Sequence, residues 1–125
     1  MKTFRRYTRI TGGHYMAMFI IRRRSEPNFA WIVSLCIFDS KRECEYWFRH
    51  QEQVVTKRHC SCGLEGVRLA LLWLKDLERK IKRGDFIVIY WTDERRHRAF
   101  SYLKRFGYTE GTFLDRPCLI FRKSS

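Results

Sequence analysis

The sequence predicts an α+β domain built on a mixed central β-sheet, and three observations indicate this class. Two long apolar segments, residues 15–23 and 29–38, are separated by a four-residue turn. Residues 64–82 carry apolar side chains at the i, i+3, i+4, i+7 spacing of a helix. A continuous apolar strand at residues 86–91 follows, and a second helical pattern comes after it. An N-terminal antiparallel meander followed by a βαβ unit produces such a mixed sheet with two main helices.

Length and composition indicate a single domain over residues 1–125. Apolar residues make up 45% of the chain and aromatic residues 16%, which is enough to fill a core. No apolar run approaches the ~20 residues that span a bilayer, and the basic N-terminus lacks the apolar segment of a secretion signal. We therefore expect a soluble cytoplasmic protein without a membrane partner. Its five scattered cysteines are expected to be reduced thiols.

The N-terminal elements are predicted to form a β-hairpin. Residues 1–13 are expected to be an irregular or edge segment that breaks at Gly12 and Gly13. Residues 15–23 and 29–38 alternate or are wholly apolar, as in buried strands. Pro27 suits the turn between them because its φ angle is fixed.

Residues 39–55 fit two interpretations. Ser40 and Glu43 have the spacing of a capping box, which indicates a helix over Lys41–His50. However, apolar and polar residues also alternate over this segment, which is typical of a strand entered through a tight turn at residues 39–41. We favour the strand, with a further short strand at residues 53–57.

The C-terminal half is predicted to hold two helices and two strands. The helix at 64–82 ends at Gly84, and the strand at 86–91 follows. Thr92 or Asp93 can cap the second helix, and Gly107 can end it. Its apolar stripe consists of Ala99, Phe100, Leu103 and Phe106. Residues 113–122 are predicted to be a last strand, and Pro117 indicates an edge position.

The order of these elements and one motif resemble the GNAT superfamily of acyl-CoA-dependent N-acyltransferases. Such proteins carry a helix that reads roughly N-x-x-A-x-x-x-Y-x-x-x-G-[FY]. Ala99, Gly107 and Tyr108 match its alanine, glycine and final aromatic residue. Arg96 stands at the asparagine position and Leu103 at the tyrosine position. The resemblance covers about the last half of the chain, and it implies a GNAT-like fold with acetyl-CoA as cofactor.

The resemblance also implies a coenzyme loop and two catalytic groups. The family binds the coenzyme pyrophosphate through R/Q-x-x-G-x-G/A at the start of the preceding helix, and this chain has KRHCSCGLEG there. The residues that this places at the coenzyme are Lys57, Arg58, Cys62, Gly63 and Gly66. Glu52 is the candidate general base and Tyr102 the candidate general acid. The plainer interpretations are a solvated carboxylate and a half-buried aromatic residue.

The charge of the chain supports a second function. Lys and Arg number 26 against 13 Asp and Glu, which gives a net charge of +13 and predicts a polyanionic partner. Two clusters carry candidate contacts to nucleic acid or an acidic protein: Arg22, Arg23 and Arg24, and Arg95, Arg96 and Arg98. The alternative to an acyltransferase is therefore a non-enzymatic basic binding protein, such as a phage or mobile-element accessory factor.

The cysteines and histidines do not predict a metal site. His59, Cys60 and Cys62 form a single C-x-C cluster, whereas zinc sites need a second pair of ligands at matching spacing. Cys36 and Cys118 lie in apolar strands and are expected in the core.

Overall fold

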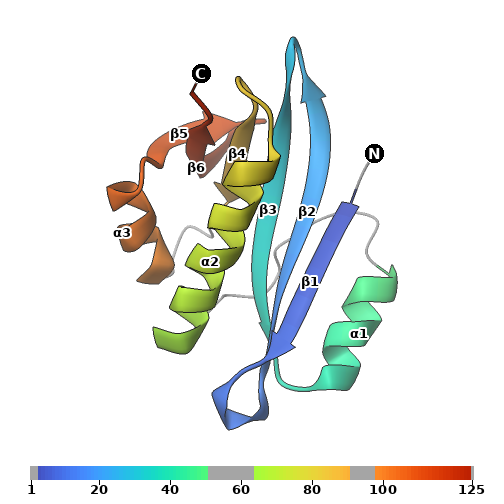
Figure 1. Cartoon of the computed structure of the whole chain (residues 1–125). Coiled ribbons are helices and arrows are strands. Elements are labelled where there is room, and N and C mark those ends of the chain that lie inside the picture. Colours follow the sequence, from blue (N-terminus) through green and yellow to red (C-terminus); the bar gives the residue numbers. More distant parts are fainter. Residues whose placement is uncertain (1–2, 51–63, 91–97, 125) are drawn as a thin grey trace.

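The computed structural model describes residues 3–50, 64–90 and 98–124, and it confirms an α+β domain with a mixed sheet (Figure 1). Six strands lie in the order β1-β2-β3-β4-β6-β5. The strands are β1 (Thr3–Arg9), β2 (Tyr15–Ser25), β3 (Asn28–Phe38), β4 (Phe86–Tyr90), β5 (Thr109–Phe113) and β6 (Arg116–Arg122). The helices of this part of the chain are α1 (Lys41–His50), α2 (Leu64–Lys80) and α3 (Arg98–Arg105), with a short 3-10 turn at Thr11–Gly13.

The pairing of the strands combines an antiparallel meander with one parallel pair. β1, β2 and β3 are antiparallel neighbours, and Ser25 faces Asn28 across the predicted hairpin turn. β3 and β4 are parallel. β6 pairs antiparallel with β4 on one side and with β5 on the other. The sheet therefore combines a meander with a βαβ unit, but the meander consists of β1–β3 and does not continue through residues 41–50 as predicted.

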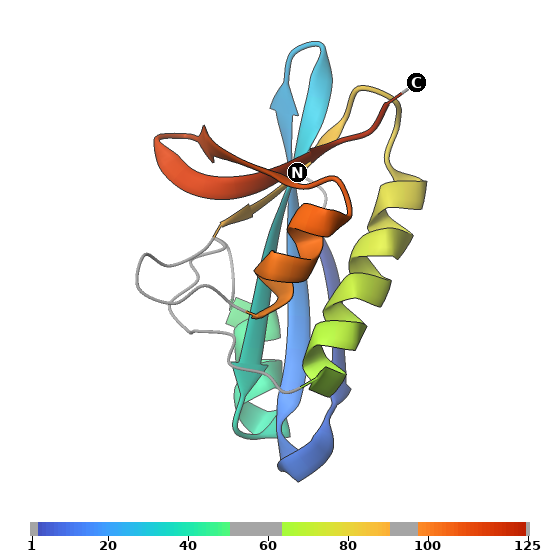
Figure 2. The same cartoon turned by 90° about the vertical axis from the view of Figure 1, so that its left-hand side faces the viewer.

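Helices cover both faces of the sheet (Figure 2). Side chains of α2 and Leu103 of α3 share one core with alternate residues of β2 and β3, such as Met18 and Val33. The opposite face packs Ala17 and Phe19 of β2 against Cys44 of α1. We call these two sides the α2 face and the α1 face.

The prediction of a strand at residues 41–50 was wrong, because this segment forms α1. The capping box decides the conformation. Ser40 Oγ accepts the Glu43 N–H at 3.2 Å, and Glu43 Oε2 accepts the Asp39 N–H at 3.3 Å. Cys44 is buried against the sheet while Tyr46 is exposed, as expected for one helix face. The strand predicted at residues 53–57 lies outside the described residues.

Of the two alternatives for the N-terminal segment, the edge position is confirmed: it forms a regular strand, β1, at one edge of the described sheet, and the chain turns at Gly12 and Gly13 as expected. The prediction of one last strand needs correction. The last stretch consists of two strands joined at Leu114 and Asp115, which both have positive φ. Pro117 lies in β6, an inner strand between β4 and β5, where it faces Thr112 of β5. The predicted edge position is therefore wrong.

The junction between α2 and β4 is held by a buried carboxylate. Asp85 is 3% exposed and accepts hydrogen bonds from the Phe29 N–H, the Trp31 indole N–H and the Lys82 N–H at 3.0–3.2 Å. Lys123 donates to the carbonyls of Arg79 and Ile81 at the end of α2. These bonds fasten the start of β3, the end of α2 and the end of the chain to one another.

α3 ends as the sequence predicts. Gly107 has a φ of +94°, and the N–H groups of Phe106 and Tyr108 both donate to the Leu103 carbonyl. Leu103 is buried as expected. Phe106 was wrongly assigned to the apolar stripe, since it is exposed and lies 5.6 Å from the Lys75 ammonium group. The described part of the chain also contains three helices, where the sequence predicted two main ones.

Candidate functional site

The ladder between the parallel strands β3 and β4 covers only the first part of β3. It runs from Ala30–Phe86 to Val33–Ile89, whereas β3 continues to Phe38 and the described part of β4 ends at Tyr90. Within the described ranges, residues 34–38 of β3 pair with β2 alone. In Figure 2 the arrow of β4 points away from β3. The backbone groups on that edge of β3 therefore lack a strand partner in the described part of the chain.

A buried hydroxyl lies at the point of divergence. Ser34 directly follows Val33, the last residue of β3 that pairs with β4, and it is 2% exposed. No described residue hydrogen-bonds to its Oγ atom. Buried polar atoms are nearly always hydrogen-bonded to protein or water, so an orphaned one needs an explanation. Ser34 thus offers a polar contact to a molecule that would lie where the strands part.

Helix α2 begins at the same end of the sheet. Figures 1 and 2 show its first turn near the end of β3. Gly66 is buried in that turn, and Glu65 exposes a carboxylate there. The first turn of a helix presents unpaired N–H groups, which favour anions. The other predicted coenzyme residues lie outside the described ranges: Lys57, Arg58, Cys62 and Gly63.

The two predicted catalytic residues are not brought together in the described part of the structure. Glu52 lies outside it. Tyr102 lies on α3, is 37% exposed and has the Arg105 guanidinium 5.9 Å from its ring centroid. The neighbouring Leu103, which stands at the family's tyrosine position, points into the core instead.

Sequence reasoning missed a buried polar pair between α2 and the start of β5. The Tyr108 hydroxyl donates to Glu78 Oε2 at 3.3 Å. Burial raises the pKa of Tyr108 well above its usual range and also raises the pKa of Glu78. The Gly-aromatic pair at 107–108 singled out Tyr108 as a residue of interest, but no pattern in the sequence indicated Glu78 as its partner.

The predicted arginine cluster of β2 is divided between the two faces of the sheet. Arg22 and Arg24 lie on the α2 face, where their guanidinium groups stand 4.4 and 5.3 Å from the Phe29 ring centroid. Arg24 is also paired with Glu26. Arg23 alternates to the α1 face and interacts electrostatically with Tyr90. Three consecutive arginines therefore do not form one patch.

The second predicted arginine cluster is largely outside the described structure. Arg95 and Arg96 precede the described part of α3, and Arg98 is its first residue. The structure therefore gives no side-chain positions for this cluster.

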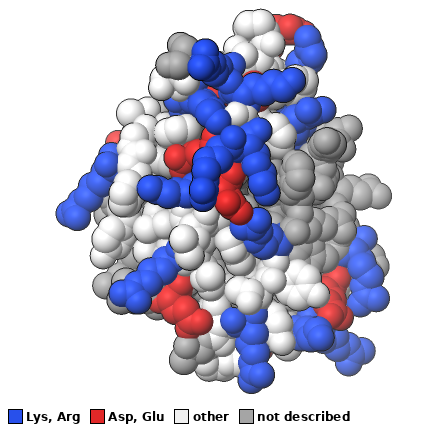
Figure 3. Space-filling model, in the orientation of Figure 1, with Lys and Arg blue, Asp and Glu red and all other residues white. Residues whose placement is uncertain are grey.

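A different basic surface covers the second half of α2 and the turn that follows. Figure 3 shows lysine and arginine side chains gathered on this face of the molecule, with few carboxylates among them. We call it the α2 basic surface; its exposed members are Lys75, Arg79, Lys80, Lys82 and Arg83. The run KDLERKIKRG carries the signal for this surface, because five of its ten residues are basic.

The two cysteines whose side chains the structure describes are core residues. Cys44 and Cys118 are buried, and burial raises the pKa of Cys44 to about 11 and also raises that of Cys118. Neither thiol is therefore activated. No group of three or more metal-ligating side chains occurs among the described residues. None of the helices in these ranges is long and apolar enough to cross a membrane.

Among the described residues, the fold and the site define an α+β domain with a mixed sheet, in which the parallel ladder of β3 and β4 is short. No protein family model matches the sequence, and no curated protein or solved structure matches it either. Functional inference therefore depends on the geometry of the chain itself.

Proposed function

We propose that this domain binds acetyl-CoA between the diverging ends of β3 and β4 and transfers the acetyl group to an amine. The observation that carries the proposal is the short β3–β4 ladder with the buried, unpartnered Ser34 hydroxyl at its end. An extended pantetheine arm can hydrogen-bond to an unpaired strand edge as an added strand would. The GNAT-like arrangement implied by the helix motif places the coenzyme at this position.

The remaining parts of the coenzyme and the chemistry follow from the same placement. The pyrophosphate would lie at the start of α2, held by Gly66 and by the residues before it: Lys57, Arg58, Cys62 and Gly63. Glu52 would take the proton from the attacking amine, and Tyr102 would give one to the leaving thiolate. The positive surface favours an acceptor amine on an acidic macromolecule.

Thermal unfolding with acetyl-CoA tests the binding step. A ligand at a hundred times its Kd adds about 2.7 kcal/mol to the free energy of unfolding, which raises the Tm measurably. ATP is the control, because it carries a comparable charge but no pantetheine arm. A shift with acetyl-CoA that ATP does not produce supports the proposal. Equal Tm shifts with the two ligands would show that the stabilisation comes from charge alone. No Tm shift at millimolar acetyl-CoA would refute binding.

Three substitutions test the named residues. Ser34→Ala removes only the unpartnered hydroxyl, so we expect nearly unchanged stability and a smaller shift with acetyl-CoA. Glu52→Gln and Tyr102→Phe should each lower kcat by about a hundredfold or more while the acetyl-CoA shift remains. Release of free CoA thiol in the presence of amine acceptors measures this step. Full activity in both variants would exclude the assigned roles.

A second candidate function is the binding of a polyanion without catalysis. The observation that favours it is the α2 basic surface, which lies away from the ends of β3 and β4. Under this proposal the acidic partner contacts α2 directly, and the separated strands have no coenzyme.

A further inference from the structure

A pocket of about 340 Å³ lies between the second half of α2 and the meander β1–β3. Its walls come from β1, β2, β3, α2 and the turn before β4. It lies at the beginning of β3 and β4, whereas the proposed coenzyme position is at their ends. The volume falls within the range of small-molecule sites.

The floor of this pocket is apolar and aromatic. Side chains of β2 and β3, among them Met18 and Trp31, meet Trp73 and Leu77 of α2. Each belongs to the main core cluster, so the pocket opens directly onto the core. A flat apolar group placed here would replace water against these side chains, which is favourable.

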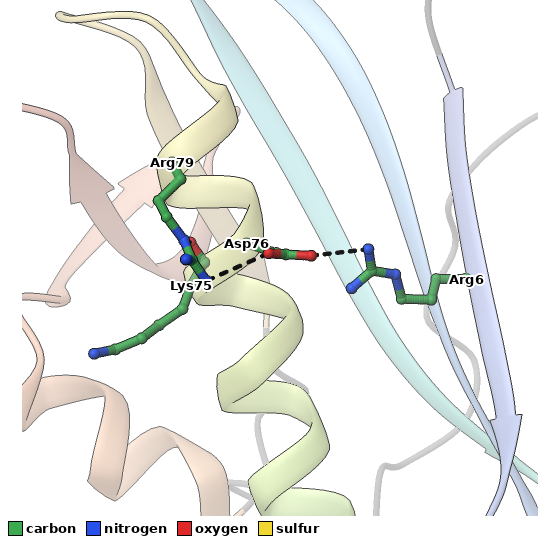
Figure 4. Close-up of polar contacts among 4 residues, drawn as sticks. All are labelled: Arg6, Lys75, Asp76 and Arg79. Atoms are coloured by element: carbon green, nitrogen blue, oxygen red, sulfur yellow. Dashed lines mark hydrogen bonds and ion pairs between the residues drawn. The ribbon is translucent and has the colours of Figure 1, made fainter.

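Both carboxylates of the pocket are already engaged. Asp76 lies between two guanidinium groups, with Arg6 at 3.0 Å and Arg79 at 3.4 Å (Figure 4). The hydrogen bond from Arg6 is the main reason why the pKa of Asp76 is lowered. Asp85 accepts three N–H groups at the base of the pocket. Both carboxylates therefore already accept hydrogen bonds from the protein itself.

The cations at the mouth outnumber these carboxylates. Arg6 is paired with Asp76, and Lys80 also interacts with that carboxylate. Arg22 stacks over Phe29 and has no carboxylate partner among the described residues. The same holds for the exposed Lys82 within these ranges. The mouth therefore carries positive charge that an anion could neutralise.

We propose that this pocket binds a small organic anion with a flat apolar body, such as an aromatic carboxylate or phosphate. The apolar body would lie on the floor between Trp31 and Leu77. The anionic group would lie at Arg22 and Lys82, since a guanidinium offers paired donors to a carboxylate or phosphate. The proposal goes beyond acyl transfer, because it concerns the opposite end of the parallel strands.

Fluorescence titration with two matched probes tests this site. The probes are 8-anilinonaphthalene-1-sulfonate and N-phenyl-1-naphthylamine, which share the ring system but differ in the sulfonate. We expect saturable one-to-one binding of the sulfonate by the native protein and at least about tenfold weaker binding of the neutral amine. Equal affinity for both probes, or no saturable binding, would overturn the proposal.

Two arginine variants locate the site. Arg22→Gln should weaken the binding of the sulfonate probe by about tenfold and leave the binding of the neutral probe unchanged. Arg116→Gln is the matched control, because Arg116 stacks over Tyr90 at 4.3 Å as Arg22 does over Phe29 at 4.4 Å, but at the other end of the sheet order. Equal weakening in both variants would overturn the assignment. Lys82→Gln, at an exposed position, repeats the test if Arg22→Gln fails to fold.

Discussion

Gly84 occupies a position where both the backbone angle and the surrounding space exclude a side chain. Its φ is +89°, and an added Cβ atom would lie 2.5 Å from Asn28 Nδ2. That amide also donates to the Arg83 carbonyl at 3.3 Å, so moving it away from Gly84 would break this hydrogen bond. The helix α2 itself ends at Lys80, before the predicted end at Gly84, and Gly84 in the following turn sets the approach of the β2–β3 hairpin.

Gly84→Ala should lower the free energy of unfolding by about 2 kcal/mol or more, since strain and a clash add together. Gly13→Ala is the matched control, because Gly13 has a φ of +80° and nothing within 4 Å of an added Cβ. It should cost about 1 kcal/mol from strain alone. Urea unfolding measures both values. Equal losses would contradict the close approach of Asn28.

Glu78 gives the stability of the domain a defined dependence on pH. Burial raises its pKa above the ordinary 4.5, so the folded state holds the proton more tightly than the unfolded state does. Ionisation of Glu78 therefore costs stability as the pH rises through the folded pKa. Glu78→Gln cannot ionise, and its amide oxygen can still accept the Tyr108 hydroxyl.

The free energy of unfolding of the native chain should therefore fall relative to Glu78→Gln as the pH rises from 4 to 7. Urea midpoints of the two proteins at several pH values give this difference. A difference that stays constant with pH would show that Glu78 titrates equally in the folded and unfolded states.

At the scale of elements, α1 illustrates how two local patterns can compete. Its sequence alternates as a strand would, yet Ser40 Oγ accepts the Glu43 N–H and the Glu43 carboxylate accepts the Asp39 N–H, as in a capping box. The cap specifies a helix start directly, whereas alternation over a few residues arises by chance in short helices. Burial of Cys44 on β2 then fixes which side of α1 faces the sheet.

Among the side chains of α3 that the structure describes, Leu103 is the one that anchors the helix in the core. Leu103 is 1% exposed in the core between α2 and the sheet. Leu103→Ala should lower the free energy of unfolding by about 3 kcal/mol through the cavity that it leaves. Leu72→Ala on α2, where the leucine is 61% exposed, should change it by less than about 0.5 kcal/mol. Similar losses in the two variants would place Leu103 outside the core.

At the scale of the whole molecule, the lysines and arginines behind the net charge of +13 are unevenly distributed over the surface. Arg22 and Arg23 face opposite sides of the sheet, and several other cations are engaged in ion pairs, such as Lys104 with Glu110 at 2.8 Å. The α2 basic surface concentrates exposed lysines and arginines instead. A long polyanion should therefore bind along α2.

Neutralising that surface should reduce the salt dependence of DNA binding. Each phosphate contact contributes about 0.9 to the slope of log K against log salt, so Lys80→Gln, Lys82→Gln and Arg83→Gln together should reduce it by about 2 to 3. The control removes three exposed charges from α1 on the other face, with Lys41→Gln, Arg42→Gln and Arg49→Gln. Fluorescence anisotropy at several salt concentrations measures both slopes. An equal reduction in the two proteins would argue against a defined surface.

Much of the fold could be predicted because its signals are local. The hairpin of β2 and β3, the core of α2, β4 and the end of α3 all follow from periodicity and turn residues within a short window. Less of the candidate site could be predicted from the sequence. Its coenzyme residues came from a motif resemblance, and only Gly66 among them lies in the described structure. The orphaned Ser34 hydroxyl could not be predicted, since its burial depends on strands far along the chain.

The sequence by itself determined the α+β class, the β2–β3 hairpin, the crossover helix and the excess of positive charge, because these depend on neighbouring residues and on composition. Only the tertiary structure decided which part of β3 pairs with β4, that Asp85 joins three segments, and that Arg22 reaches a pocket floored by Trp31 and Leu77. The physical reason is that pairing partners and burial are set by contacts between distant residues. No local pattern records those contacts.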